Sequence, residues 1–183
     1  MSYKSVNSLS ELISIAEQQD ANLAESWFER IELIKHKVKF VKNRPRILCL
    51  ESIDPIVVAG KWIPELIDNA GGEHLLVNAT EPPTTITFNE LLASDPDGII
   101  IAINGNSKEL TRTQLEMFIH SDDWKQLKAV QKGHVFVADG LTYFHNPGEG
   151  LIDTAEMIAE ILQVNQFFYG MEGQYWEQMP AIL

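Results

Sequence analysis

The sequence predicts an α/β fold, namely a Rossmann-like, mostly parallel sheet flanked by helices and preceded by a long helix. Short apolar runs alternate with amphipathic stretches after residue 45, which is the spacing of βαβ units. Residues 99–103 are apolar on both faces, as in a buried central strand. The chain has 183 residues, 45% of them hydrophobic and 22% charged. This length and composition suit one globular domain with its own core.

The first predicted element is a long helix in two pieces over residues 8–42. Ser8 and Glu11 have the spacing of a capping box, and Asp20 can cap the second piece. A single apolar stripe then recurs every three or four residues, at Leu23, Trp27, Ile31, Ile34, Val38 and Val41. Pro45 ends the helix, because the residue before a proline is disfavoured in helical conformation.

The remainder of the chain is expected to form four or five strands with 99–103 in the centre. The apolar runs that predict strands are 47–50, 75–77, 99–103 and 134–138. Helices are predicted from Trp62 or Ile63 to Gly72, after a capping box at Thr87 and Glu90, over 111–119 and over 151–162. The chain therefore divides into a helical strut, residues 1–43, and a single α/β lobe, residues 44–183.

The charge of the chain restricts its partners. Fourteen Lys and Arg stand against 26 Asp and Glu, which gives a net charge of -12. This balance disfavours nucleic acid and anionic membranes, since both attract a basic face. Six of the cations are nonetheless concentrated in one short stretch, at Lys35, Lys37, Lys39, Lys42, Arg44 and Arg46. We interpret this run first as a solvated helix end that complements the helix dipole, and second as an anion site.

Cysteine content and hydropathy limit the disulfides, metal sites and cellular locations that we expect for the protein. The single cysteine, Cys49, excludes an intrachain disulfide and a zinc site made of several thiolates. No apolar run reaches the length of a membrane span, so no membrane insertion is expected. The first residues lack the apolar segment of a secretory signal. A cytoplasmic location is therefore expected if Met1 is the native start.

The candidate site lies where the parallel strands end, because ligands bind beyond the carboxyl ends of open sheets. Three loops meet this criterion: 51–55, 104–107 and 139–145. They contain carboxylates, amides, a histidine and aromatic rings, but no Gly-x-Ser-x-Gly elbow, and no glycine-rich phosphate loop follows the first strand. We therefore predict that the protein is not an enzyme.

Two residue groups in these loops have alternative interpretations. Glu51, Asp54, Asp139 and His145 all follow strands, so a metal site is conceivable, but loop carboxylates more often brace turns and cap helices. No metal or cofactor is therefore predicted. Trp62 either packs beneath its own loop or forms an exposed aromatic rim on which a flat ligand stacks.

Several sequence blocks together resemble one family. Leu50-Glu51-Ser52-Ile53-Asp54-Pro55, followed by Ala59-Gly60-Lys61-Trp62-Ile63-Pro64 and Asp68-Asn69-Ala70-Gly71-Gly72, is similar to the second lobe of ABC-transporter substrate-binding proteins for cobalamin and ferric siderophores. Further matching blocks are 91–103, 124–130, 135–140 and 143–148, in the order of the family. The resemblance implies two lobes joined by a long helix, which the segment 8–42 matches. No counterpart of the first lobe precedes it in this sequence.

The resemblance also implies a site and partners. Ligand contacts are expected at Asp54, Pro55, Trp62, Asn104, Gly105, Tyr143, Phe144 and His145. Glu65 and Asp68 lie where relatives present acids to the transporter permease, although helix-dipole compensation explains two acids there equally well. The implied ligand is cobalamin, a related corrinoid or a ferric siderophore, and the implied relatives are periplasmic or cell-surface proteins.

Two functions follow from these observations. The first is a non-enzymatic module that binds a small ligand. The alternative is a lobe that has lost solute binding and serves as a cytoplasmic protein-interaction or regulatory domain. A homodimer is also expected, because Pro55, Trp62, Tyr143 and Phe144 would form an apolar rim that faces water without a first lobe to cover it.

Overall fold

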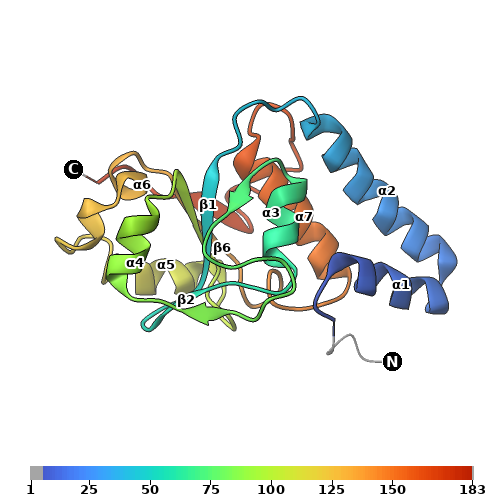
Figure 1. Ribbon diagram of the computed structural model, residues 1–183, viewed down its shortest axis with the longest axis horizontal. Coiled ribbons are helices and arrows are strands. Elements are labelled where there is room, and N and C mark those ends of the chain that lie inside the picture. The colour runs from blue at the N-terminus through green and yellow to red at the C-terminus, as the bar shows by residue number, and fades with distance from the viewer. Residues whose placement is uncertain (1–5, 183) are drawn as a thin grey trace.

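The computed structural model describes residues 6–182 and begins with the two predicted helices (Figure 1). Helix α1 covers Leu9–Gln19 and α2 covers Ala21–Val38. Asp20 separates them, and its carboxylate accepts hydrogen bonds from the backbone amides of Asn22 and Leu23 at 3.0 and 3.2 Å. The predicted break is confirmed. The helix ends earlier than expected, because a turn closed by the Val41 amide and the Val38 carbonyl follows it.

Within the described residues the sheet has seven strands, in the order β4-β2-β1-β5-β6-β7, with β3 paired to β1. The central strands β1 (Arg46–Ile53), β5 (Gly98–Ile101) and β6 (Val135–Ala138) are parallel. The edge strands β2 (Ile56–Val58), β4 (Thr84–Thr85) and β7 (Trp176–Gln178) run antiparallel to their neighbours, and β3 (Glu73–His74) runs parallel to β1. The predicted α/β class and the central position of 99–101 are confirmed.

The expected number of strands and the expected strand at 75–77 are wrong. The pairing with β1 falls on Glu73 and His74 instead, just before that apolar run. Leu75 and Val77 are buried beneath the second face of the sheet. The Leu75 amide still donates to the Ile47 carbonyl of β1 at 3.0 Å, but the strand does not continue to Val77. The additional edge strands contain only two or three residues each, too few for a recognisable alternation of apolar and polar side chains.

Helices cover both faces of the sheet (Figure 1). Helices α1, α2, α3 (Ile63–Asn69) and α7 (Glu149–Leu162) share one hydrophobic core with Ile47 and Cys49 of β1. Leu48 and Leu50 point to the other core, under α4 (Phe88–Ser94), α5 (Lys108–Glu116), the 3-10 turn η2 (Trp124–Gln126) and α6 (Lys128–Gln131). Alternate residues of one strand thus fill opposite cores.

The helix α2 packs on the outside of α7 rather than on the sheet, as the layers of Figure 1 show. Its stripe residues Trp27, Ile31 and Ile34 belong to the first core. On the flank of the stripe, the Arg30 guanidinium binds Asp153 of α7 at 2.5 Å and Glu156 at 2.7 Å. The division into a strut and a separate lobe stays a prediction. No helix in the described part of the chain is long and apolar enough to cross a bilayer.

Candidate binding pocket at the carboxyl edge of the sheet

The three loops singled out in the sequence meet at the carboxyl edge of the parallel strands. The Asn104 amide donates to the Glu51 carbonyl at 3.0 Å, which joins the ends of β5 and β1. The Gly140 amide donates to the Asn106 carbonyl at 3.0 Å, which joins the loop after β6 to the same place. Parallel strands therefore bring residues some ninety positions apart into one edge, as the topology predicts.

A pocket of about 70 Å³ opens at this edge. It is lined by Glu51, Gly60, Lys61, Trp62, Ile63, Pro83, Asn104 and His145. Three of the expected ligand contacts, Trp62, Asn104 and His145, thus lie together. Two further groups that can carry charge, Glu51 and Lys61, come from the end of β1 and from the turn before α3.

Burial changes the acid–base behaviour of the two groups that face each other in the pocket. His145 Nε2 donates to the Ala102 carbonyl at 2.6 Å, and Nδ1 lies 3.6 Å from Glu51 Oε2. Burial lowers the pKa of the His145 imidazole, and the Lys61 charge lowers it further. Burial also raises the pKa of the Glu51 carboxyl group, against the opposing effect of Lys61. The ring is therefore a neutral group at pH 7, and Lys61 is the cation of the pocket.

The backbone at Lys61 is unusual for a residue with a side chain, with φ of +56°. Two hydrogen bonds hold it there: the Lys61 amide donates to the Glu81 carbonyl at 2.6 Å, and the Thr80 amide donates to the Lys61 carbonyl at 2.8 Å. The preceding Gly60 lies so close to the backbone of residues 81–83 that a Cβ would not fit. The Lys61 ammonium lies 5.4 Å from the centre of the Trp62 ring, within the range of a cation–π contact.

The exposed aromatic rim expected at Trp62 and Phe144 is wrong, because both side chains are buried. The Trp62 indole donates its Nε1 proton to the Phe144 carbonyl at 2.7 Å. The Phe144 amide in turn donates to Thr154 Oγ1 at 2.9 Å. A buried indole needs a partner for its N–H, and this distant carbonyl supplies it. Trp62 therefore packs beneath the loop at 139–148 and reaches the pocket only as part of its wall.

The other expected contacts lie outside the pocket. Asp54 and Pro55 are exposed at the turn between β1 and β2, and Asp54 lines a different pocket, of about 230 Å³, beside α5. Gly105 is exposed. Tyr143 is half-buried against Tyr175, with ring centres 5.1 Å apart, and burial together with that neighbour raises the pKa of the Tyr143 phenol to about 12.

Among the loop carboxylates, Asp139 acts as a brace, the alternative favoured over a metal site. The Asp139 carboxylate accepts from the amides of Leu141 and Thr142 at 3.0 and 2.7 Å. In the part of the chain that the structure describes, no three histidine, cysteine or acidic side chains form a cluster that could hold a metal. Lys61 was missed as a site residue. Its place directly after Gly60, between a strand end and a helix start, is the only signal that the sequence offers.

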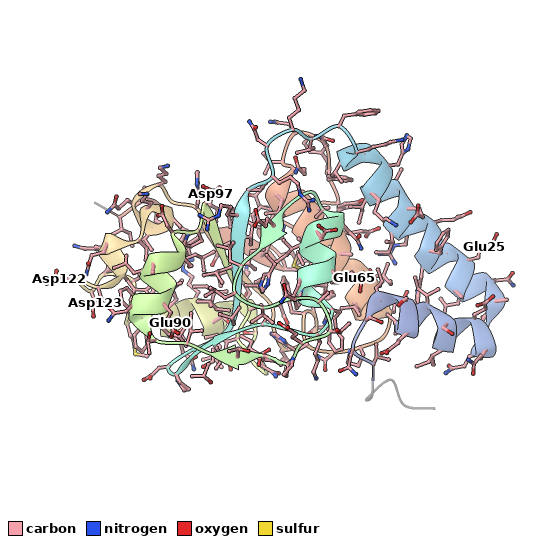
Figure 2. All side chains as sticks on the ribbon, viewed as in Figure 1. Glu25, Glu65, Glu90, Asp97, Asp122 and Asp123 are labelled. Carbon is pink, nitrogen blue, oxygen red and sulfur yellow. The ribbon has the colours of Figure 1, made fainter. Side chains whose placement is uncertain are left out.

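The two acids on α3 have partners within the chain. Glu65, labelled in Figure 2, accepts from the Leu9 amide at 2.9 Å and so caps the start of α1. Asp68 is exposed and paired with Arg44 at the other end of α3. Helix capping thus explains Glu65 better than dipole compensation within its own helix, and any docking role for either acid stays a prediction.

The fold is thus an α/β domain whose pocket lies at the carboxyl ends of its parallel strands, the edge at which open parallel sheets bind ligands. The sequence pattern of the family described as "Periplasmic binding protein" matches residues 10–142. The chain belongs to this family, as its motifs led us to expect. The family and the structural neighbours named below are solute-binding proteins, not enzymes.

Individual relatives share the fold at low identity. Over 106 residues the chain is 29% identical to the high-affinity heme uptake system protein IsdE of Staphylococcus aureus (strain MRSA252), across 56% of this chain and 36% of that protein. A periplasmic heme binding protein from Pseudomonas aeruginosa superposes with a TM-score of 0.71, at 15% identity over 95% of this chain and 64% of the other.

A second solved structure extends the comparison to another ligand. The periplasmic vitamin B12 binding protein BtuF of Vibrio cholerae gives a TM-score of 0.67, at 17% identity over 87% of this chain and 63% of the other. The chain spans about a third of the curated relative that it matches and less than two thirds of either structure. These similarities show the fold.

Proposed function

We propose that the chain binds a tetrapyrrole, either heme or a cobalamin-type corrinoid, at the carboxyl edge of its sheet and releases it chemically unchanged. The observation that carries the proposal is the meeting of Glu51, Lys61 and His145 in one pocket walled by Trp62. Proteins named for binding heme and vitamin B12 share the fold. A ferric siderophore is the alternative ligand that the sequence implies.

The size of the pocket limits what enters it. A volume of about 70 Å³ is well below the roughly 300–1,000 Å³ of pockets that enclose a drug-sized ligand. Only a polar substituent of the macrocycle fits inside, and the ring itself lies over the edge of the sheet. The chain therefore binds one side of its ligand, and we expect weak affinity for this chain alone.

The charges in the pocket indicate which substituent enters. Lys61 supplies the cation, and a ligand carboxylate or phosphate is its natural partner. His145 has Nε2 engaged with the Ala102 carbonyl, and its Nδ1 faces Glu51. We therefore assign the ring to positioning Glu51 and the loop at 139–148, rather than to a bond with a metal in the ligand.

Titration of the chain with hemin, cobalamin and an iron-loaded hydroxamate siderophore, followed by absorbance and calorimetry, tests the proposal. Lys61→Met should weaken binding of the preferred ligand by at least about tenfold, since a charged hydrogen bond is lost. Lys132→Met is the matched control, because Lys132 is an exposed lysine outside the pocket. Equal effects of the two variants would overturn the pocket assignment.

Failure of all three ligands to bind up to their solubility limits would overturn ligand binding itself. That result would favour the alternative, a lobe that has lost solute binding and interacts with proteins instead. Binding of the siderophore alone would refute the proposal of a tetrapyrrole ligand, but it would agree with the pocket as the binding site.

We further propose an ABC-transporter permease as the protein partner, supported by membership of a family that delivers small ligands to such permeases. Glu65 can reach a permease only by releasing the Leu9 amide, whereas Asp68 is already exposed. Asp68→Asn should therefore weaken a permease interaction more than Glu65→Gln, as measured by pull-down with the permease in detergent. The reverse order would overturn this assignment.

A further inference from the structure

The end of α2 and the loop that follows it carry a concentration of positive charge that the proposed function does not use. Between Lys35 and Arg46 the chain has six cations and no carboxylate. The other residues carry 8 Lys and Arg against 26 Asp and Glu. At physiological salt, charges more than about 8 Å apart are largely screened. This segment therefore presents a local positive surface despite the net charge of -12.

Few carboxylates neutralise these cations. Glu32 pairs with Lys35 at 2.5 Å, and Asp68 pairs with Arg44. For Lys37, Lys39 and Lys42 no carboxylate lies within bonding distance among the residues that the structure describes. Figure 2 shows nitrogen-tipped side chains at this end of the molecule, while the labelled Asp122 and Asp123 lie on the opposite side of the view.

Two phenylalanines stand at the same end with their rings in solvent. Phe40 is 81% exposed and Phe168 is 80% exposed. The loop at 163–170 lies beside the end of α2 (Figure 1), where the Lys37 ammonium contacts the Gln166 carbonyl at 3.3 Å. Phe167 packs inward under Lys37, whose ammonium is 4.9 Å from its ring centre. Phe168, the next residue, projects outward.

A hollow lies between the cations. It has a volume of about 260 Å³ and is lined by Lys35, Val38, Lys39, Val41, Arg44, Asp68, Asn69 and Gly71. Since Lys35 and Arg44 are paired with carboxylates, Lys39 is the cation of this lining that can meet a phosphate group. The aliphatic walls tolerate the glycerol portion of a lipid. Exposed aromatic rings beside lysines form the combination that binds at the interface of anionic bilayers.

We propose that this basic–aromatic end, formed by Lys37, Lys39, Phe40, Lys42 and Phe168, docks the protein on an anionic lipid surface. It lies at the amino ends of the parallel strands, because Arg46 begins β1 while Glu51 lies near the end of that strand. The ligand pocket is at the opposite edge and stays open to solvent when this end contacts a bilayer. The proposal does not depend on the identity of the ligand.

An anionic membrane fits this end better than a nucleic acid. Single-stranded nucleic acid binds along a charged groove that follows its backbone, whereas these residues form a helix end and an adjacent loop around one hollow of about 260 Å³. The acidic surfaces beyond this end would repel a long polyanion. A flat bilayer contacts only the basic–aromatic end.

Co-sedimentation with vesicles of phosphatidylcholine, with and without phosphatidylglycerol, tests the proposal. We expect binding only to the anionic vesicles, weakened by salt. Each cation near such a surface tightens binding about fivefold, so the triple variant Lys37→Gln, Lys39→Gln, Lys42→Gln should bind about a hundredfold more weakly. As a matched pair, Lys39→Gln should bind about fivefold more weakly, whereas Arg112→Gln, which removes one exposed charge on α5, should bind as the parent does.

The phenylalanines distinguish a bilayer from other anions. Phe40→Ser with Phe168→Ser should weaken vesicle binding several-fold and leave binding of free glycerol phosphate unchanged. Circular dichroism of every variant reports whether the fold is intact, and the salt dependence of parent binding gives a measurement free of mutation. The proposal is overturned by no binding to anionic vesicles, by equal loss in Lys39→Gln and Arg112→Gln, or by RNA binding as tight as vesicle binding.

Discussion

The ring of His74 is the group whose titration should most change the stability of the fold. It sits on β3, where Nδ1 donates to the Val77 carbonyl at 3.0 Å and Nε2 accepts from the Cys49 amide at 3.4 Å. A ring that accepts at one nitrogen and donates at the other is neutral. Burial lowers the pKa of His74 from an ordinary 6.5 to about 4.

This depressed pKa couples protonation to unfolding. Between pH 6.5 and about 4 the unfolded chain binds a proton at His74 that the folded chain does not, so the free energy of unfolding falls as the pH falls. The loss begins near pH 6.5 and is complete below pH 4. At about 1.36 kcal/mol for each pKa unit, the shift corresponds to roughly 3 kcal/mol. That is a large part of the stability of a domain of this size.

Urea unfolding of the parent and of His74→Gln, followed by circular dichroism from pH 8 to pH 4, measures this effect. The variant loses the ring hydrogen bonds and should be the less stable protein at pH 8. The difference in free energy of unfolding between the parent and the variant should shrink toward pH 4, because only the parent has an imidazole ring at this position to protonate. The raised pKa of Glu51, which works in the opposite direction, is common to both proteins and cancels in the difference.

His36→Gln provides the control, since His36 is an exposed histidine on α2. The free energy of unfolding of His36→Gln should differ from that of the parent by the same amount at every pH. A gap between parent and His74→Gln that stays constant from pH 8 to pH 4 would refute the buried, neutral ring.

Three further predictions concern the core, the strut and self-association. Ile101→Asp should abolish cooperative unfolding, because an unpaired charge in a fully buried strand costs several kcal/mol; a soluble variant with an unchanged urea midpoint would show that the central strand is misplaced. Arg30→Met should destabilise the fold by about 2 kcal/mol through the partly buried Glu156, and adding Glu156→Gln should recover part of that loss in a double-mutant cycle. The expected homodimer was predicted from an exposed apolar rim, but Trp62 and Phe144 of that rim are buried. Sedimentation equilibrium at low and high salt tests whether the dimer forms, and a monomer under both conditions would contradict the prediction.

The parts of the fold that were predictable depend on local or periodic signals. The break at Asp20 and the capping box at Thr87 and Glu90 each satisfy backbone amides with side chains a few residues away. The central strand shows as an apolar run whose alternate residues enter opposite cores. The meeting of the three loops follows from parallel strands alone. Each of these features can be found without knowing the position of any distant residue.

The errors concern features that a distant partner decides. Trp62 is buried because the carbonyl of Phe144, 82 residues away, accepts its indole proton. Glu65 serves α1 through the Leu9 amide, 56 residues away. Asp54 shares a loop with the end of β1, yet the turn into β2 carries it to another pocket. The sequence around each of these residues does not reveal which distant group it will contact in the fold.

The backbone itself supports the pocket independently of any relative. Five non-glycine residues in the described chain have positive φ: Lys61, Leu76, Thr80, Asp95 and Phe144. One of them, Lys61, lines the pocket, and two others support its wall, since Thr80 bonds to Lys61 and the Phe144 carbonyl accepts from Trp62. Such conformations cost about 1–3 kcal/mol each and persist where surrounding contacts enforce them, often at ligand sites. Lys61 holds a strained backbone conformation while its side chain lines the pocket, which agrees with a role of its ammonium group in binding. We therefore expect Lys61 to be the residue that contacts the proposed ligand.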